Sequence, residues 1–139
     1  MLRLPWELVR ERILAGLHER GFDDLNVAHF NVLQYPGPDK LRPSELAAQM
    51  RMSKQAANYL LGQMEELGYL ERKRDRADPR LRVIRLTPRG RRAFTAIREI
   101  VAEVEADWER ELGTRSFREF RELLQRLNSV VAEHSLRPE

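Results

Sequence analysis

Apolar and polar residues alternate with a period of two over residues 69–86. In the segments on either side, apolar residues recur every three or four positions. Turn-forming residues at 75–79 separate the run 69–74 from the β-rich run 81–86, and this pattern predicts a β-hairpin. The 139-residue chain is 34% charged and 42% apolar, and its hydrophobicity lies in stripes of helical spacing, which favours amphipathic helices over a thick sheet. The sequence therefore predicts a mainly α protein with one small β-hairpin.

The hairpin region is also strongly basic. Ten Lys or Arg residues lie between Arg72 and Arg92, and with Glu71, Asp75 and Asp78 counted the segment has a net charge of +7, ten minus three. The whole chain has a net charge of only +3. Such a patch indicates a polyanionic partner. A phosphate backbone fits this description, because its neutralisation by Lys and Arg releases condensed counterions and favours binding. Solubility or protection of an edge strand explains some of these arginines equally well.

Capping and stop signals predict six helices. The expected helices begin at a hydroxyl, an amide or a proline, and several end at glycine or proline. The start signals are Pro5, Asn26, Pro43 with Ser44 and Glu45, Ser53, and Thr87 with Pro88; the stop signals are Gly21, Pro36 to Pro38 and Gly68. The apolar period over 117–131 indicates the sixth helix.

The fourth expected helix, from Ser53 to about Leu67, has two faces that differ in kind. The outer face is rich in amides, which can bond two groups of one base edge at once. With the short helix before it, this helix forms a helix-turn-helix, and the basic hairpin that follows completes a winged helix. A helix fits the major groove of DNA, and a narrow charged loop fits the minor groove. The inner stripe is Ala57, Leu60, Leu61, Met64 and Leu67, and the outer face is Gln55, Asn58, Tyr59, Gly62 and Gln63.

Four segments of the chain resemble the MarR family of bacterial and archaeal transcriptional regulators. They are Glu45-Leu46-Ala47, Leu67 to Arg72, the wing Asp75 to Arg80, and Leu86 to Gly90. The resemblance implies a winged helix-turn-helix domain flanked by N- and C-terminal dimerisation helices. In this interpretation residues 1–139 form a single domain, with the DNA-binding part at about 26–90 and the dimerisation part at 1–25 and 91–139.

The resemblance also assigns roles at the wing tip. It implies that Arg80 enters the minor groove and that Asp78 orients its basic neighbours. Pro79 stands where relatives commonly place another arginine, so we expect one phosphate contact fewer and a stiffer tip. The residues expected to contact DNA are Arg42, Ser53, Lys54, Gln55, Asn58, Tyr59, Arg72, Arg74, Arg76, Asp78, Arg80 and Arg82.

Two heptad-like apolar seams follow the hairpin. One is Phe94, Ile97, Val101, Val104 and Trp108, and the other is Phe117, Phe120, Leu124, Leu127 and Val131. A chain this small has few ways to bury both seams, so we expect a homodimer. A two-fold dimer places its recognition helices about 34 Å apart and predicts a palindromic operator. The expected dimerisation residues are Trp6, Phe94, Ile97, Val101, Phe117, Phe120, Leu124, Leu127 and Val131.

Some of these features have plainer interpretations. The outer face of the fourth helix is also compatible with a solvated surface. The aromatic residues Trp6, Phe30, Tyr35 and Trp108 are candidates for an effector pocket, but aromatic residues at helical spacing usually belong to the core. The histidines show no metal-site spacing and the chain has no cysteine to assist them. The sequence therefore does not decide whether His18, His29 or His134 bind a metal.

Together these patterns predict a sequence-specific DNA-binding transcriptional regulator. We expect a homodimeric repressor that a small-molecule effector releases from its operator. The alternatives are a winged-helix protein–protein interaction module and a metal-responsive regulator. No phosphate-binding loop or serine elbow indicates an enzyme, and no cofactor is expected. The chain has no apolar run of membrane-spanning length and no cysteine, so we expect a cytoplasmic protein without membrane contact.

Overall fold

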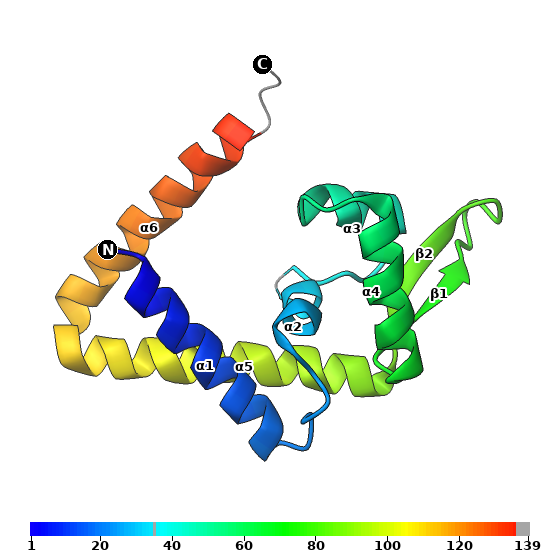
Figure 1. The fold of residues 1–139 in the computed structure, drawn as a ribbon. Coiled ribbons are helices and arrows are strands. Elements are labelled where there is room, and N and C mark those ends of the chain that lie inside the picture. The colour runs from blue at the N-terminus through cyan, green and yellow to red at the C-terminus, as the bar shows by residue number, and fades with distance from the viewer. Residues whose placement is uncertain (35, 136–139) are drawn as a thin grey trace. The chain divides into compact units, whose positions relative to one another are not determined.

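The computed structural model describes residues 1–34 and 36–135, and the chain divides into two compact units, residues 1–101 and 102–139. The expected mainly α fold with one hairpin is confirmed (Figure 1). The elements are α1 (Arg3–Glu19), α2 (Val27–Leu33), α3 (Pro43–Gln49), α4 (Lys54–Glu66), β1 (Leu70–Arg74), β2 (Arg82–Leu86), α5 (Pro88–Leu112) and α6 (Thr114–Ser135). Helix α5 contributes to both units.

Local signals in the sequence set the ends of the helices. Asn26 caps α2, since its Oδ1 accepts the backbone N–H of His29 at 3.1 Å. Ser53 caps α4 in the same manner, with Oγ accepting the N–H of Ala56 at 3.1 Å. Gly68, with φ of +81°, terminates α4 in the left-handed region that glycine adopts without a Cβ penalty. Each of these caps matches a signal in the sequence.

The core of the first unit gathers residues from α1 to α5. The apolar stripe of α4 faces inward as expected, and α3 packs against α4. At the crossing of α1 and α5, a Cβ on Gly16 would lie only 2.6 Å from the side chain of Ile100, so glycine permits the close approach of the two helices. The largest fully buried side chains of this unit are Tyr69, Phe30, Ile13, Leu17, Leu33, Leu61, Met64, Leu70, Ile84, Ile100 and Val32.

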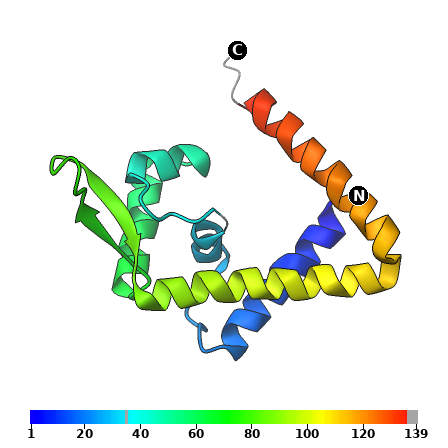
Figure 2. The same cartoon turned by 180° about the vertical axis from the view of Figure 1, so that it is seen from behind.

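The hairpin is antiparallel, and its register pairs Leu70 with Leu86 and Arg74 with Arg82. The outer edge of β2 is also covered, because Lys40 donates its N–H to Ile84 O and Ile84 donates its N–H to Leu41 O, both at 2.8 Å. This backbone pairing anchors the connection between α2 and α3 on the sheet. The tip of the hairpin extends away from the helices of the first unit (Figure 2).

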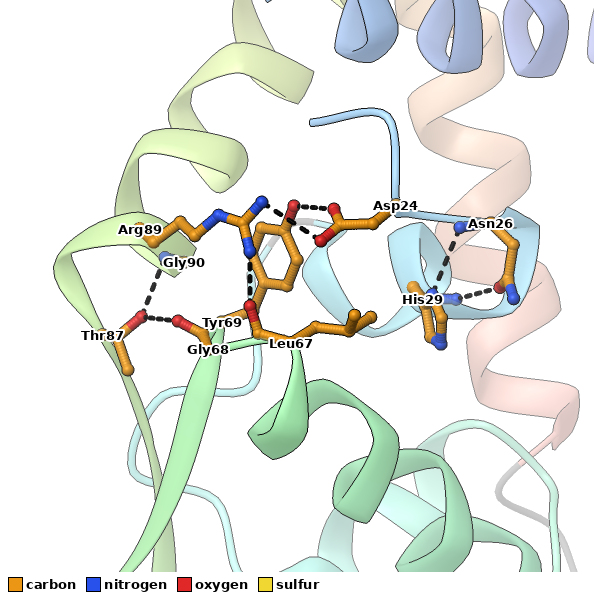
Figure 3. Close-up of polar contacts among 9 residues, drawn as sticks. All are labelled: Asp24, Asn26, His29, Leu67, Gly68, Tyr69, Thr87, Arg89 and Gly90. Atoms are coloured by element: carbon orange, nitrogen blue, oxygen red, sulfur yellow. Dashed lines mark hydrogen bonds and ion pairs between the residues drawn. The ribbon is translucent and has the colours of Figure 1, made fainter. Parts of the chain in front are cut away.

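Helix α5 begins in tight contact with the start of β1 (Figure 3). Thr87 Oγ1 accepts the N–H of Gly90 at 3.1 Å and donates to the carbonyl oxygen of Gly68 at 2.5 Å. A Cβ on Gly90 would lie 1.8 Å from the backbone oxygen of Tyr69, a distance that no side chain tolerates. Glycine at position 90 therefore allows α5 to start directly against the backbone that leads into β1.

A polar cluster of Asp24, Tyr69 and Arg89 joins three parts of the first unit (Figure 3). Arg89 pairs with Asp24 Oδ2 at 3.1 Å and donates to the backbone oxygen of Leu67. The hydroxyl of Tyr69 donates to the other carboxylate oxygen of Asp24. Burial, followed by the hydrogen bond to Asp24, raises the pKa of Tyr69 above its ordinary value. The cluster ties the α1–α2 connection to the end of α4 and the start of α5.

In the second unit, the aromatic rings cluster where α6 follows α5. The rings of Trp108 and Phe120 meet edge to face with centroids 6.5 Å apart, and Phe117 lies 6.2 Å from Phe120. Glu105 and Arg121 form an ion pair of 3.7 Å. Farther along α6 the apolar side chains Leu123, Leu127, Val130 and Val131 are exposed. None of the described helices is both long and apolar enough to cross a membrane.

Candidate nucleic-acid interface

A cationic cleft forms where α3, α4 and the hairpin converge. Its volume is about 310 Å³. Basic side chains enter it from the start of α3, from the start of α4 and from the hairpin, so three elements distant in sequence supply its charge. The lining residues are Arg42, Pro43, Ser44, Lys54, Asn58, Arg80, Leu81 and Arg82. Five of the residues expected to contact DNA thus lie together, whereas Pro43, Ser44 and Leu81 were not anticipated.

The outer face of α4 is open to solvent. Lys54, Gln55, Asn58 and Tyr59 are exposed, and the side of the helix opposite them is buried. Tyr59 is 71% exposed, so it does not pack on α3 as a core residue would. Ser53 is committed to capping the helix, and its hydroxyl oxygen receives a backbone N–H there. The face is therefore available to a groove of DNA.

Two aspartates shape the wing tip. Asp75 Oδ1 accepts the N–H of Ala77, and Asp78 Oδ1 accepts the N–H of Arg80, both at 3.1 Å. Asp78 also lies 3.5 Å from Arg80 Nε, while the Arg80 side chain is 93% exposed. The side-chain-to-backbone bonds fix the loop in two tight turns and leave the Arg80 guanidinium projecting into solvent.

Seven of the ten basic side chains in the segment 72–92 fall into two groups. One group is paired within the fold: Arg72 with Glu65, Lys73 with Glu71, Arg89 with Asp24, and Arg91 with Asp39. Among the described residues, no ion pair engages Arg74, Arg76 or Arg82, which are exposed along the hairpin. The positive charge offered to a partner is therefore concentrated at the wing.

Arg72 differs from the other expected DNA contacts because it is largely engaged by the protein. Its Nε donates to Glu65 Oε1 at 2.5 Å, and Nη2 donates to Oε2 at 3.3 Å. Its Nη1 donates to Asn58 Oδ1 at 3.3 Å, and the side chain is only 23% exposed. Arg72 consequently braces α4 from β1.

A second series of hydrogen bonds connects α4 to α2. His29, which is 4% exposed, accepts the backbone N–H of Asn26 at Nδ1, so its N–H is on Nε2. Nε2 lies 3.3 Å from Gln63 Oε1, and Gln63 Nε2 donates to the hydroxyl oxygen of Tyr59 at 3.2 Å. The buried histidine thus acts in the helix cap and in orienting the exposed tyrosine.

The histidines and aromatic residues occupy different settings. Among the described residues, no group of three or more His, Asp or Glu side chains could hold a metal ion. His18 is exposed, and His134 Nδ1 lies 2.7 Å from the backbone oxygen of Val130. Phe30 is fully buried in the core, and Tyr35 lies outside the described residues.

A separate cavity of about 310 Å³ lies beside α2 and α3. Three amide side chains and three apolar ones provide most of its walls, and the remaining lining comes from the connection after α2. The lining residues are Asn31, Val32, Gln34, Pro36, Gly37, Leu46, Gln49 and Met50. Of the aromatic residues considered from the sequence, Trp6, Phe30 and Trp108 are not among them, and Tyr35 lies outside the described residues.

The expected dimerisation residues are distributed between core and surface. Ile97 and Phe117 are buried, at 3% and 5% exposure. The side chains of Phe94, Val101 and Leu124 are half-buried. The side chains of Trp6, Phe120, Leu127 and Val131 are exposed. The sequence pattern did not separate the positions that the fold itself covers from those that it leaves exposed.

Comparisons with known proteins agree with this geometry. The MarR family model matches residues 23–81, and no curated protein sequence matches the chain. A transcriptional regulator from Thermotoga maritima is 24% identical, with 99% of this chain and 95% of that chain covered and a TM-score of 0.63. FabT of Streptococcus pneumoniae, solved in complex with DNA, has a TM-score of 0.80 at 17% identity, covering 95% and 93%. A MarR family protein of Mycobacterium tuberculosis, solved with salicylic acid, is 26% identical, covering 91% and 92%, with a TM-score of 0.65.

Proposed function

We propose that this chain, which belongs to the MarR family of winged-helix transcriptional regulators, binds an operator in duplex DNA as a homodimer. The observation that carries the proposal is the cationic cleft, where Arg42, Lys54 and Arg82 from three elements meet beside the exposed face of α4. The part at about 26–90 contacts DNA, and the parts at 1–25 and 91–139 form the dimer.

The division of contacts follows from the dimensions of DNA. Helix α4 is the recognition helix of this proposal: it presents its exposed side chains to base edges in the major groove, which admits an α-helix. The wing tip carries Arg80 into the neighbouring minor groove, where the negative potential attracts arginine. Side chains of the cleft hold the phosphates between the two grooves and so fix the register of α4.

The proposal is tested by selecting bound fragments from a randomised duplex pool and then measuring their affinity over a range of salt concentrations. Arg80→Ala should weaken binding and reduce the slope of log K against log salt by about 0.9, the value for removing one cationic group that neutralises the DNA. Arg115→Ala in α6 is a matched control, because its side chain is 94% exposed and carries the same charge. Failure of the wild-type protein to enrich any sequence, or equal effects of the two variants, would contradict the proposal.

The dimer interface draws on the apolar surface of α6. Leu123, Leu127, Val130 and Val131 are exposed within two turns of each other, and water contact with such a stripe is unfavourable. A second copy of the chain would bury this stripe about a two-fold axis and bring two recognition helices to one face of the DNA. The operator is then a palindrome.

Release by a small molecule is the regulatory part of the proposal. The cavity beside α2 and α3 lies next to the helix that packs on α4, so an occupant can bias the position of the recognition helix. The M. tuberculosis protein was solved with salicylic acid, which makes salicylate a suitable first probe. Salicylate should lower operator affinity by roughly 5- to 150-fold, and Gln49→Leu in the cavity wall should reduce that response. An unchanged affinity across a panel of aromatic acids would reject release by this class of effector.

A further inference from the structure

The recognition helix presents amide and hydroxyl groups whose orientation the rest of the protein has already fixed. An asparagine amide has a donor end and an acceptor end that are exchanged by a half-turn of its side chain. Asn58 is exposed on α4 in the cationic cleft, and its orientation decides which base edges it can read. The residue that fixes the orientation of this amide therefore affects which bases Asn58 can recognise.

Arg72 determines the orientation of Asn58. A guanidinium has only donors, so the Asn58 atom that lies 3.3 Å from Arg72 Nη1 must be the oxygen. Arg72 is itself held by two hydrogen bonds to Glu65, at 2.5 and 3.3 Å, and it cannot turn away without breaking that bidentate pair. Among the described residues, no partner engages Asn58 Nδ2. The amide thus has its oxygen occupied and its NH2 group available.

The hydrogen bonds that run from His29 through Gln63 leave the Tyr59 hydroxyl with a donor to offer, as in Asn58. His29 Nε2 carries the ring hydrogen and faces Gln63 Oε1, so Gln63 offers its NH2 group to the Tyr59 hydroxyl oxygen. With its oxygen accepting that bond, the hydroxyl still has its own hydrogen to donate, and no described residue of the chain accepts it. Two neighbouring positions of the recognition face consequently both present donors.

We propose that Arg72 is a positioning residue that makes Asn58 a reader of acceptor edges, above all the N7 and O6 atoms of guanine. The inference rests on the proposed DNA-binding function. A bidentate contact to adenine needs an amide oxygen facing N6–H2 as well as a donor facing N7. In this protein the oxygen faces the Arg72 guanidinium, which competes with the amino group of adenine for the same lone pairs. Guanine offers two acceptors and needs no oxygen from Asn58.

The test compares base preferences among fragments selected from a randomised duplex pool at one fixed salt concentration. The base pair read by Asn58 is the one whose preference disappears in Asn58→Ala. We expect guanine there, favoured over adenine by about tenfold in the wild-type protein. Arg72→Met keeps the length of the side chain and removes its donors, so the preference for guanine over adenine should fall toward onefold.

Arg74→Met is the matched control, because residue 74 lies two positions along the same strand and is exposed. It should weaken binding to all sequences alike and leave the preference for guanine unchanged. This readout separates positioning from a general loss of charge, which lowers affinity without changing the ratio between bases.

Three results would overturn the inference. One is a preference for adenine at the Asn58 position, another is an unchanged ratio in Arg72→Met, and the third is the absence of any position that depends on Asn58. A wild-type protein that enriches no sequence would refute the proposed function itself. If thermal melting shows that Arg72→Met is unfolded, Asn58→Asp at the exposed site decides the matter, because it keeps an oxygen toward Arg72 and turns an acceptor outward. It should abolish the preference for guanine, and retention of that preference would overturn the inference.

Discussion

The guanidinium of Arg89 lies over the ring of Tyr69, with its central carbon 4.3 Å from the ring centroid. The same group pairs with Asp24 and donates to the carbonyl oxygen of Leu67, the residue that caps α4 (Figure 3). The end of α4 is therefore attached to the first turn of α5 by a charged group stacked on a buried ring.

Replacement of Arg89 should measure the contribution of this attachment. Arg89→Met removes the ion pair, the bond to Leu67 and the contact with the Tyr69 ring. Because the Arg89 side chain is still 35% exposed, solvent screens part of the loss, and we expect a decrease of about 1–2 kcal/mol in the free energy of unfolding. Urea titration gives the value, and Arg92→Met, an exposed position on the same helix, should stay within about 0.5 kcal/mol. Equal losses in the two variants would contradict the role of the cluster.

Substitution of alanine for two helical glycines should change the free energy of unfolding in opposite directions. In Gly90→Ala the added Cβ would meet the backbone oxygen of Tyr69, which cannot move without displacing β1, so we expect a loss of about 3 kcal/mol or more. In Gly62→Ala the Cβ meets nothing within 4 Å, and the smaller backbone entropy of the unfolded chain should stabilise the protein by about 0.5–1 kcal/mol. Thermal or urea unfolding of the pair tests both signs at once.

Alkaline pH should destabilise the protein through Tyr69. The pKa of this phenol is raised in the folded state, so the folded protein holds the proton more tightly than the unfolded chain. Its contribution to stability is complete below the unfolded pKa of about 10 and is lost as the pH rises above that value. The melting temperature should therefore fall above pH 10 in the wild-type protein. Tyr69→Phe should show a shallower fall, and parallel curves for the two proteins would argue against this origin.

A charge on the apolar stripe of α6 should disrupt the proposed dimer. Leu127→Glu places a carboxylate among Leu123, Val130 and Val131, where a second copy would have to bury it unpaired. Gln125→Glu introduces the same charge at an exposed polar position of the same helix. Sedimentation should show monomers for Leu127→Glu and the wild-type state for Gln125→Glu. A Leu127→Glu protein that sediments as the wild type does would place the interface elsewhere.

The helices and the hairpin were predictable because their signals are local. A cap such as Ser53, a left-handed glycine such as Gly68 and the period of an apolar stripe all act within a few residues of the backbone they shape. The cover on the outer edge of β2 was not predictable in this way. It joins Lys40 and Leu41 to Ile84, across more than forty residues, and only the packing of α3 brings them together.

The sequence by itself determined that ten basic residues lie between Arg72 and Arg92, on and just after a hairpin that follows a polar-faced helix, and it placed Asp78 and Arg80 at the tip. It did not distinguish the charges that serve the fold from those that face outward. Tertiary structure made that division, by placing Glu65 beside Arg72 and Asp24 beside Arg89 while Arg80 stayed exposed. The physical reason is that the strength of an ion pair depends on distance and burial, and for residues such as Asp24 and Arg89, which are 65 positions apart, both are set by packing.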